Sequence, residues 1–481
     1  MQQSKNKKTF TEISDYCKND GRLVNIFNNL LQDFDLRYIN SLFSAVKKQG
    51  VNASDVFRSL FLLKFINFDN VHQLMQSGIS KELSHKKDVF YDFLNNPKIN
   101  WRNILWLFTK QALKLISNKS IDEDNIHPKC LVVDDSILPK TGKTIELIGK
   151  VFDHGTHAYK LGMKLLTLGY NDGKSFTPLD FSLHHEPTKK KNRGMKAKDL
   201  NKQYSKERPQ DTPGYEREKE ISESKIDIAI NMIIRILKRN IKVDYVLADS
   251  WFISEDFIKS IVAFNKSVNV IGLLKMNRIL NINGKKLNAN KVADVYRKNI
   301  RYCKSLKCHY IKKKVSYKGI ELVGFWVKMQ GQENWKLLIT TDTNLSFIKA
   351  MKIYQIRWSI EVFFKDCKQS LKLNSCQSKD LDAHIATISL IFMNYTVLSM
   401  KRRFEDYETL GILFKRCKDL ILEQTLIERI WNLFEKILNS LLIDLGVDLD
   451  KVMTKLIENY DGFIDQCNKS FETLFAFDIK R

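Results

Sequence analysis

Apolar residues recur at helical spacing through the first quarter of the chain. From about residue 23 to residue 118 they fall three or four positions apart, for example at 26–34 and at 56–65. This is the period of helices that bury one face. The pattern predicts an all-helical N-terminal domain over residues 1–125. The basic residues of this region could follow DNA phosphates, but a solvated basic face accounts for them equally well.

Short apolar runs replace the helical spacing at Cys130. The runs CLVVDDS at 130–136, YKLGMKLLTLGY at 159–170 and SFTPLDFSLH at 175–184 are typical of strands. The tripeptide NDG at 171–173 is a hairpin turn signal between the second run and the third. The simplest prediction is three consecutive strands.

Helices and strands alternate after these runs. An isoleucine-rich helix at 226–236 is followed by the strand YVLADSWF at 245–252, a helix at about 254–264 and a strand from 269. Three strands followed by alternating helices and strands predict an α/β fold, with a mixed sheet and helices packed on it. The first part of this sheet domain takes in residues 126–277.

A second group of β-type segments follows, and helical spacing then returns. Residues 278–344 contain the runs HYIKKKVSY, IELVGFWVKM and WKLLITT, which predict a mostly antiparallel, β-rich insertion. Residues 345–405 are predicted to be helical and to complete the sheet domain. An amphipathic stripe in the helical C-terminal region, 406–481, is typical of a dimerisation helix or of ordinary core packing, and packing is the commoner case.

One segment inside the predicted sheet domain is strongly polar. Residues 186–219 carry KKK at 189–191 and further basic residues as far as Arg208, with few apolar side chains to bury. This composition predicts a mobile basic loop, either a solvated linker or a strap that becomes ordered on DNA.

The charge balance narrows the class of partner. Lys and Arg number 79 against 55 Asp and Glu, a formal net charge of +24. A field of this sign concentrates polyanions around the protein, so nucleic acid is the natural partner. An AT-rich genome, which favours Lys and Asn codons, accounts for part of the excess.

The eight cysteines are scattered, without the paired close spacings of a disulfide framework or a zinc site. Cys303, Cys308 and His309 form the one cluster that approaches a metal site, and it lacks a partner pair. The N-terminus is polar, and apolar stretches such as 388–400 are too short to span a membrane. We therefore expect a cytoplasmic protein with reduced thiols and no membrane segment.

The segment YQIRWSIEVFFKDCK at 354–368 carries a stripe of polar residues. On one continuous α-helix, at about 100° per residue, four of them share a face within about 60°. They are Tyr354, Arg357, Glu361 and Lys368. A glutamate between an arginine and a lysine indicates either a helical ion-pair ladder or a site for metal ions and phosphates. The spacing alone favours the ladder.

Aspartates at the ends of two buried-looking strands shift that balance. Asp134 and Asp135 follow CLVV, and Asp249 follows YVLA. Charged groups in such places are costly unless they are paired or bind a metal ion, although a strand-end turn explains any one of them equally well. Paired carboxylates can hold the two Mg²⁺ ions that phosphodiester chemistry uses.

With these residues the sequence resembles the bacterial insertion-sequence DDE transposases, which have an RNase H-like core and a Tyr-x2-Arg-x3-Glu-x6-Lys signature. Residues 354–368 complete the signature, and Asp134-Asp135-Ser136 matches the family's first aspartate. Asp249 matches the second aspartate, and residues 278–343 match the β-rich insertion before the glutamate helix. The resemblance spans about residues 130–403 and implies metal-dependent cleavage at the element's ends, followed by strand transfer into target DNA.

The resemblance assigns the metal ligands. Asp134, Asp249 and Glu361 would bind two Mg²⁺ ions, for which Mn²⁺ can substitute. Because adjacent strand residues face opposite ways, only one of Asp134 and Asp135 enters the site. We prefer Asp134, with Asp135 as the alternative first aspartate.

The resemblance also assigns the contacts with DNA. Arg357 and Lys368 would contact phosphates near the cut, and Tyr354 would contact DNA beside the scissile bond. Similar enzymes act on double-stranded DNA as dimers on paired ends, often through a hairpin intermediate. Trp251 and Trp358 could stack on unpaired bases, but a tryptophan beside a buried strand or helix is usually part of the core.

Two other functions are compatible with the sequence. The first is a domesticated or inactive transposase that only binds DNA, although binding alone does not require all three acids. The second is an RNase H-like nuclease that cleaves without joining, which has no need of a long helical N-terminal domain. Terminal inverted repeats beside the gene and an assay for strand transfer distinguish these hypotheses.

Overall fold

A computed structural model gives the fold of most of the chain. It describes residues 31–66, 68–77, 86–119, 127–186, 193–404 and 411–415. Residues 30–414 form one compact unit, which is the part considered below. Apart from 411–415, the predicted C-terminal helical region and its amphipathic stripe lie outside the described residues.

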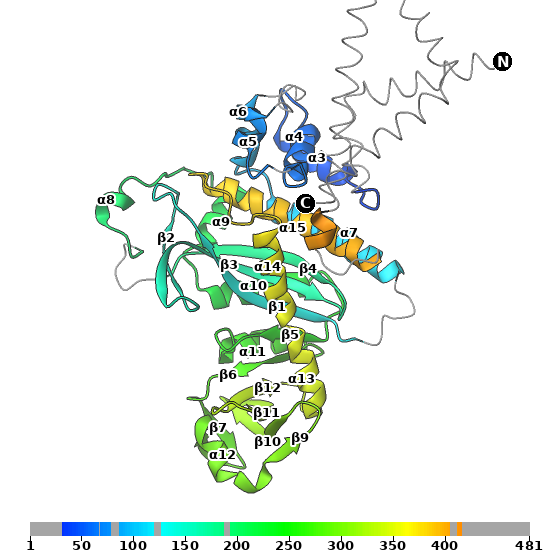
Figure 1. The fold of residues 1–481 in the computed structure, drawn as a ribbon, viewed down its shortest axis with the longest axis vertical. Helices are drawn as coiled ribbons and strands as arrows, with labels where there is room; N and C mark the ends of the chain where they lie inside the picture. Colours follow the sequence, from blue (N-terminus) through cyan, green and yellow to red (C-terminus); the bar gives the residue numbers. More distant parts are fainter. Residues whose placement is uncertain are drawn as a thin grey trace, which may run out of the picture. The chain divides into compact units, whose positions relative to one another are not determined.

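The N-terminal part of this unit is helical, as its spacing predicts (Figure 1). Its helices are α3 (Arg37–Val46), α4 (Ala53–Leu62), α5 (Val71–Gln76), α6 (Lys87–Leu94) and α7 (Trp101–Lys119). The side chains of Asn52 and Asn70 accept backbone N–H bonds at the starts of α4 and α5, which satisfies donors that a helix leaves unpaired. Aromatic rings fill the space between the helices; Phe43 alone contacts three other rings, those of Phe57, Phe93 and Trp101.

A mixed sheet forms the centre of this unit. Its core strands are β1 (Cys130–Pro139), β2 (Gly149–Asp153), β3 (Ala158–Asn171), β4 (Phe176–His184), β5 (Tyr245–Ala248) and β6 (Asn269–Leu274). Strand β3 pairs antiparallel with β1, β2 and β4, whereas β5 pairs parallel with both β1 and β6. The order β4-β3-β1-β5-β6 is the mixed sheet expected of an RNase H-like core. Strand β2 pairs with the beginning of β3, from Ala158 to Gly162. The sequence pattern did not reveal this strand.

The β-rich insertion continues this sheet. Its strands are β7 (Ile279–Ile282), β8 (Lys285–Asn288), β9 (Arg301–Cys303), β10 (Cys308–Tyr317), β11 (Ile320–Met329) and β12 (Lys336–Thr340). All their pairings are antiparallel, as predicted, and β12 pairs with β6 of the core. The insertion is therefore joined edge to edge with the core sheet.

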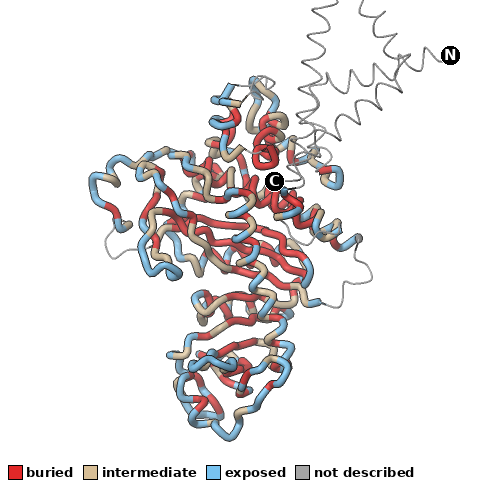
Figure 2. Tube along the Cα trace, in the orientation of Figure 1, coloured by how far each residue is buried: buried red, intermediate tan, exposed pale blue. Residues whose placement is uncertain are grey.

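Helices cover the core sheet. Those packed on it or leading to it are α10 (Lys225–Leu237), α11 (Glu255–Phe264), α13 (Phe347–Gln355), α14 (Trp358–Gln369) and α15 (Leu381–Phe404). Strand β4 contacts α7, α10, α14 and α15, and every one of its residues is buried (Figure 2). The remaining short elements are α8 (Ala197–Leu200), α9 (Pro213–Glu220), α12 (Val292–Val295) and the 3₁₀ turns Ala289–Lys291 and Arg297–Asn299.

Helix α15 combines unusual length with an apolar composition. Of the helices in the described ranges, it is the one long and apolar enough to cross a membrane, and 94% of its most apolar window is buried inside the protein. It lies beside α7 and packs on β4 (Figure 1). The fold itself therefore accounts for its apolar surface.

The prediction of a mobile basic loop is wrong for residues 193–219. Arg208 is fully buried and forms ion pairs with Glu146 at 2.7 Å and with Asp382 at 3.1 Å. Lys206 contacts Asp380 and Asp382 at 2.8 and 2.9 Å. Composition misleads here because a segment with few apolar residues can still be ordered by buried, paired charges.

A second buried network fixes the end of the same segment. Glu220, at the end of α9, accepts from Arg102 of α7 at 2.7 Å. Arg102 also contacts Asp180 of β4 at 3.0 Å, and Asp180 pairs in addition with Arg235 of α10. These charges tie α7, α9 and α10 to one strand.

Replacing Arg208 by Met should lower the free energy of unfolding by about 3–5 kcal/mol, because Glu146, Asp380 and Asp382 would remain buried without their shared guanidinium. Chemical denaturation of the full-length protein measures the change. The matched control is Arg37→Met, which removes an arginine that is 92% exposed and pairs with Asp35; it should leave the midpoint unchanged. Equal midpoints for both variants would contradict a structural role for the Arg208 network.

Candidate active site

The register between β1 and β5 brings two of the predicted acids together. The parallel pairing runs from Cys130 opposite Tyr245 to Val133 opposite Ala248, and β5 ends there. Asp134 directly follows Val133, and Asp249 directly follows Ala248. β1 itself continues to Pro139, so Asp134 lies in mid-strand where one neighbour stops, and the expectation of a strand end was wrong for β1.

Asp249 is held by the turn that follows β5. The backbone N–H of Trp251 donates to its Oδ1 at 2.8 Å. This bond orients the carboxylate while leaving its other oxygen available. Such a turn is the structural role that strand-end aspartates often have, and here it coincides with a position beside a second acid.

The predicted single helix over 354–368 is interrupted. Helix α13 ends at Gln355 and α14 begins at Trp358. At the junction Arg357 N–H donates to Tyr354 O at 3.0 Å, and Ile360 N–H donates to Arg357 O at 3.2 Å. Bonds three residues apart tighten the turn, so the helical-wheel angles do not hold across it.

Arg357 bridges two of the acids. Its Nη1 contacts Asp134 Oδ2 at 2.8 Å, and its Nη2 contacts Glu361 Oε1 at 2.7 Å. The first bond joins the residue directly before α14 to β1, and the second links that residue to the first turn of α14. Both interpretations of the polar stripe therefore hold in part, because Arg357 and Glu361 form a helical ion pair and also enter the cluster around Asp134.

The cluster carries more negative charge than its surroundings compensate. Burial, reinforced by the charge of Asp249, raises the pKa of Asp134 to about 7 although Arg357 opposes the shift. Burial also raises the pKa of Tyr354 to about 12, with Asp249 and Asp134 contributing and Arg357 opposing. Tyr354 is therefore a neutral hydrogen-bond donor beside the acids at physiological pH.

Asp135 faces the other side of β1. Its carboxylate pairs with Lys225 at the start of α10, and the Lys225 ammonium lies 4.0 Å from the ring centre of Trp251. Asp134 and Asp135 thus point to opposite faces, as strand geometry requires. The structure gathers Asp134, not Asp135, with Arg357 and Glu361. Lys225 had no distinguishing signal in the sequence, because it is one of many lysines and begins an ordinary amphipathic helix.

The two tryptophans near the acids are exposed, which contradicts their expected place in the core. Trp251 is 42% exposed and Trp358 is 61% exposed. Both stand at turns, Trp251 after β5 and Trp358 at the start of α14. The sequence pattern misplaced them because it extended the strand and the helix through these turns.

Lys368 lies at the far end of α14, where it donates to Ser136 Oγ at 2.7 Å. Ser136 is two residues beyond Asp134 and so shares its face of β1. Lys368 also lines a polar cleft of about 350 Å³, together with Lys160 and Lys164 of β3 and His154 of the β2–β3 turn. Because β2 was not predicted, sequence reasoning missed this basic wall.

The donor set is suited to hard cations but is not assembled around one. In the part of the chain that the structure describes, no three His, Cys, Asp or Glu side chains stand close enough together to hold a metal ion. Arg357 occupies the space between Asp134 and Glu361. Carboxylate oxygens are the ligands that Mg²⁺ prefers, and a cluster short of positive charge favours a cation, so the chemistry of these side chains suits such an ion. Cys303 and Cys308 merely face each other on β9 and β10.

Asp134→Asn should raise the thermal midpoint of the metal-free protein more at pH 8 than at pH 5. The folded-state pKa of Asp134, about 7, lies above the ordinary value of 3.8. The folded protein therefore holds the proton more tightly, and the wild type loses stability as pH rises from about 4 to about 7. Asn carries no charge at either pH and escapes this loss.

Scanning calorimetry at the two pH values measures the difference. The matched control is Asp135→Asn, which removes the neighbouring carboxylate and its ion pair with Lys225 on the opposite face. This control should lower the midpoint at both pH values. An Asp134→Asn effect that is the same at pH 5 and pH 8 would show that the carboxyl is not held at a raised pKa.

Comparison with solved structures gives distant likenesses. No curated protein matches the chain significantly. Solved structures similar to it include a piggyBac transposase synaptic complex with hairpin DNA, at 12% identity and a TM-score of 0.40, covering 86% of this chain and 83% of that one. A likeness this remote carries no argument about the site.

Family models give the stronger result. The model described as "Transposase DDE domain" matches residues 222–397, which include Asp249 and Glu361. The model described as "DDE superfamily endonuclease" matches residues 75–292, which include Asp134 and Asp249. Both describe metal-dependent enzymes that cleave nucleic acids, and the matched segments coincide with the sheet that carries the acids. The chain therefore carries a DDE transposase domain, matched over residues 222–397.

Proposed function

We propose that this transposase mobilises a bacterial insertion sequence, cutting DNA at the ends of the element and joining the freed 3′ hydroxyl to target DNA. The observation that carries the proposal is the cluster in which Asp134 and Glu361 share Arg357 while Asp249 lies beside Asp134. Acidic side chains whose negative charge is not balanced by nearby positive charge are costly in a folded protein. Their presence therefore favours a catalytic use. We expect the enzyme to act in the cytoplasm.

Asp134, Asp249 and Glu361 would hold two Mg²⁺ ions, for which Mn²⁺ can substitute. Bound ions supply an activated nucleophile and stabilise charge on the leaving oxygen. The three acids come from a strand, from the turn after the neighbouring strand and from a helix. The sheet therefore positions Asp134 and Asp249, and α14 positions Glu361.

The basic and hydroxyl groups beside the acids are suited to binding DNA. Arg357 keeps two carboxylates together in the metal-free protein, and its planar guanidinium can instead pair with a phosphate. Tyr354 would donate its neutral hydroxyl beside the scissile bond. Lys368 would contact a neighbouring phosphate, because its side chain lines the polar cleft. Burial lowers the pKa of Lys368.

The proposed partner is double-stranded DNA, as element ends and as target. A net charge of +24 favours association with polyanions and predicts strong salt dependence. Strand transfer requires two ends to be brought to one target, so we also propose that the enzyme works as a homodimer on paired ends.

Glu361→Gln and Asp249→Asn should each bind a duplex carrying the element's ends like the wild type but reduce Mg²⁺-dependent cleavage and joining at least 100-fold. Each change removes a charged oxygen ligand while preserving side-chain volume. Gel analysis of an end-labelled duplex separates binding, nicking and strand transfer.

Asp366→Asn is the matched control, because Asp366 lies on the same helix outside the cluster; it should retain activity. Cutting by the wild type without strand transfer would indicate a nuclease that does not join. Binding without cutting by the wild type would indicate a protein that only binds DNA. Wild-type activity in both site variants would refute the metal-binding assignment.

A further inference from the structure

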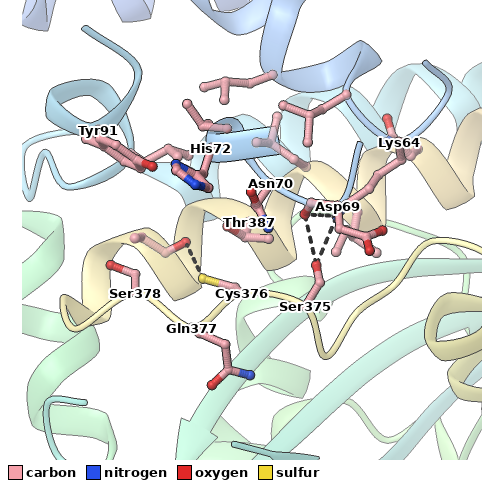
Figure 3. A pocket seen from close by; sticks show the side chains of 18 residues that line it. Lys64, Asp69, Asn70, His72, Tyr91, Ser375, Cys376, Gln377, Ser378 and Thr387 are labelled. Atoms are coloured by element: carbon pink, nitrogen blue, oxygen red, sulfur yellow. Dashed lines mark hydrogen bonds between the residues drawn. The ribbon is translucent and has the colours of Figure 1, made fainter. Parts of the chain in front are cut away.

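A largely apolar cavity lies away from the acids, between the N-terminal helices and α15. It has a volume of about 350 Å³, within the range of small-molecule sites. Its walls come from α4, α5, α6 and α15 and from the loop 370–380 that joins α14 to α15 (Figure 3). Apolar surface comes from Leu60 of α4, from Leu63 directly after it, and from Leu390 and Ile391 of α15.

Polar groups converge on this apolar space. Asn394 of α15 is 1% exposed and lines the cavity; its Nδ2 donates to Phe61 O at 3.2 Å, but its Oδ1 has no hydrogen-bond partner among the described residues. A buried acceptor without a donor is costly, so the cavity favours an occupant that brings an N–H group. Lys64 adds a cationic group, held by Asp69 O and by Ser375 Oγ at 2.9 Å.

Cys376 adds a nucleophile to the same wall (Figure 3). Its Sγ lies 3.9 Å from Ala383 O, and its side chain is only partly buried. Burial would raise the pKa of this thiol, but the charge and hydrogen bond of His384, together with Lys140, outweigh burial and lower the pKa to about 6. Cys376 is therefore largely a thiolate at neutral pH.

The other described cysteines lie in different surroundings. Cys130, Cys303, Cys308 and Cys367 are all buried and line none of this cavity. Burial raises the pKa of Cys130, Cys308 and Cys367, which keeps these three as unreactive thiols.

We propose that Cys376 is a modification site, whose thiolate forms a mixed disulfide with small peptide disulfides that enter the cavity. The thiolate sulfur attacks one sulfur of the reagent, the reagent's S–S bond breaks, and its other half leaves as a thiolate. The protein sulfur is oxidised and the leaving half is reduced, so no further oxidant is needed. Amide N–H groups of the bound half suit Asn394, and its carboxylates suit Lys64.

Peptide mass mapping after exposure of the native full-length protein to oxidised glutathione tests the proposal. Cys376 should acquire the glutathione adduct at least ten-fold faster than Cys130, Cys303, Cys308 or Cys367, and dithiothreitol should remove it. Faster labelling of any of these four, or an unmodified Cys376 in native protein whose denatured form reacts, would overturn the proposal.

Four variants separate the roles of the thiol, of His384 and of the cavity. Cys376→Ser should abolish the adduct, whereas the matched control Cys303→Ser should leave it unchanged. His384→Asn should slow adduct formation about ten-fold with unchanged circular dichroism, because Cys376 loses the side chain that does most to lower its pKa. Thr387→Trp, which narrows the cavity, should slow glutathione disulfide more than the small reagent iodoacetamide. Equal slowing of both reagents would mean that the cavity does not admit the disulfide.

The modified loop is joined to the catalytic sheet. Lys140, directly after β1, donates to Cys376 O at 2.6 Å, and Thr141 N–H donates to Gln377 Oε1 at 3.2 Å. An adduct should therefore lower DNA cleavage several-fold in the wild type but not in Cys376→Ser. This consequence rests on the proposed function, whereas the mass measurement does not. An adduct on an inactive protein would refute the proposed function and leave the modification site standing.

Discussion

The parallel pairing of β1 with β5 stops at Val133 and Ala248, and the rest of the site depends on where it stops. Each strand continues directly into an aspartate, so the register alone makes Asp134 and Asp249 neighbours. Pairing with β3 holds β1 straight beyond this point, which fixes Asp134 and Ser136 on the face toward α14. A shift of one residue would turn Asp134 away and present Asp135 instead, because side chains alternate along a strand.

Buried charge has two distinct uses in this protein. Asp180, inside the core, is surrounded by Arg102, Arg217 and Arg235; burial would raise its pKa, but the three cations lower it. For Asp134, burial and the nearby charge of Asp249 outweigh Arg357, so its pKa rises instead. The structural acids are compensated by the protein itself, whereas the acids of the site lack a positive charge that something else must supply.

Helix α14 connects the acid cluster to the polar cleft and to the loop 370–380. Its first turn carries Glu361, its last turn carries Lys368, and the loop beyond it reaches both the end of β1 and the N-terminal helices through Cys376 and Ser375. The glutamate helix is thus anchored at its far end by contacts outside the catalytic sheet. The segment 193–219 adds a further anchor, because its Arg208 pairs with Asp380, directly before α15, and with Asp382, in the first turn of α15.

Periodicity by itself determined the helical N-terminal part, the mixed sheet and the antiparallel insertion, because alternation and helical spacing reflect which faces are buried. Charge beside buried runs marked the aspartates as candidates, whereas the resemblance to a known family assigned the signature residues and their roles. Only the tertiary structure decided which of Asp134 and Asp135 lies beside Arg357 and Glu361, where the helix breaks before Trp358, that residues 193–219 are ordered, and where the cavity around Cys376 lies. Each of these depends on partners that are far away in the chain, such as Lys225 for Asp135 and Glu146 for Arg208, and pairing between distant charges leaves no local pattern.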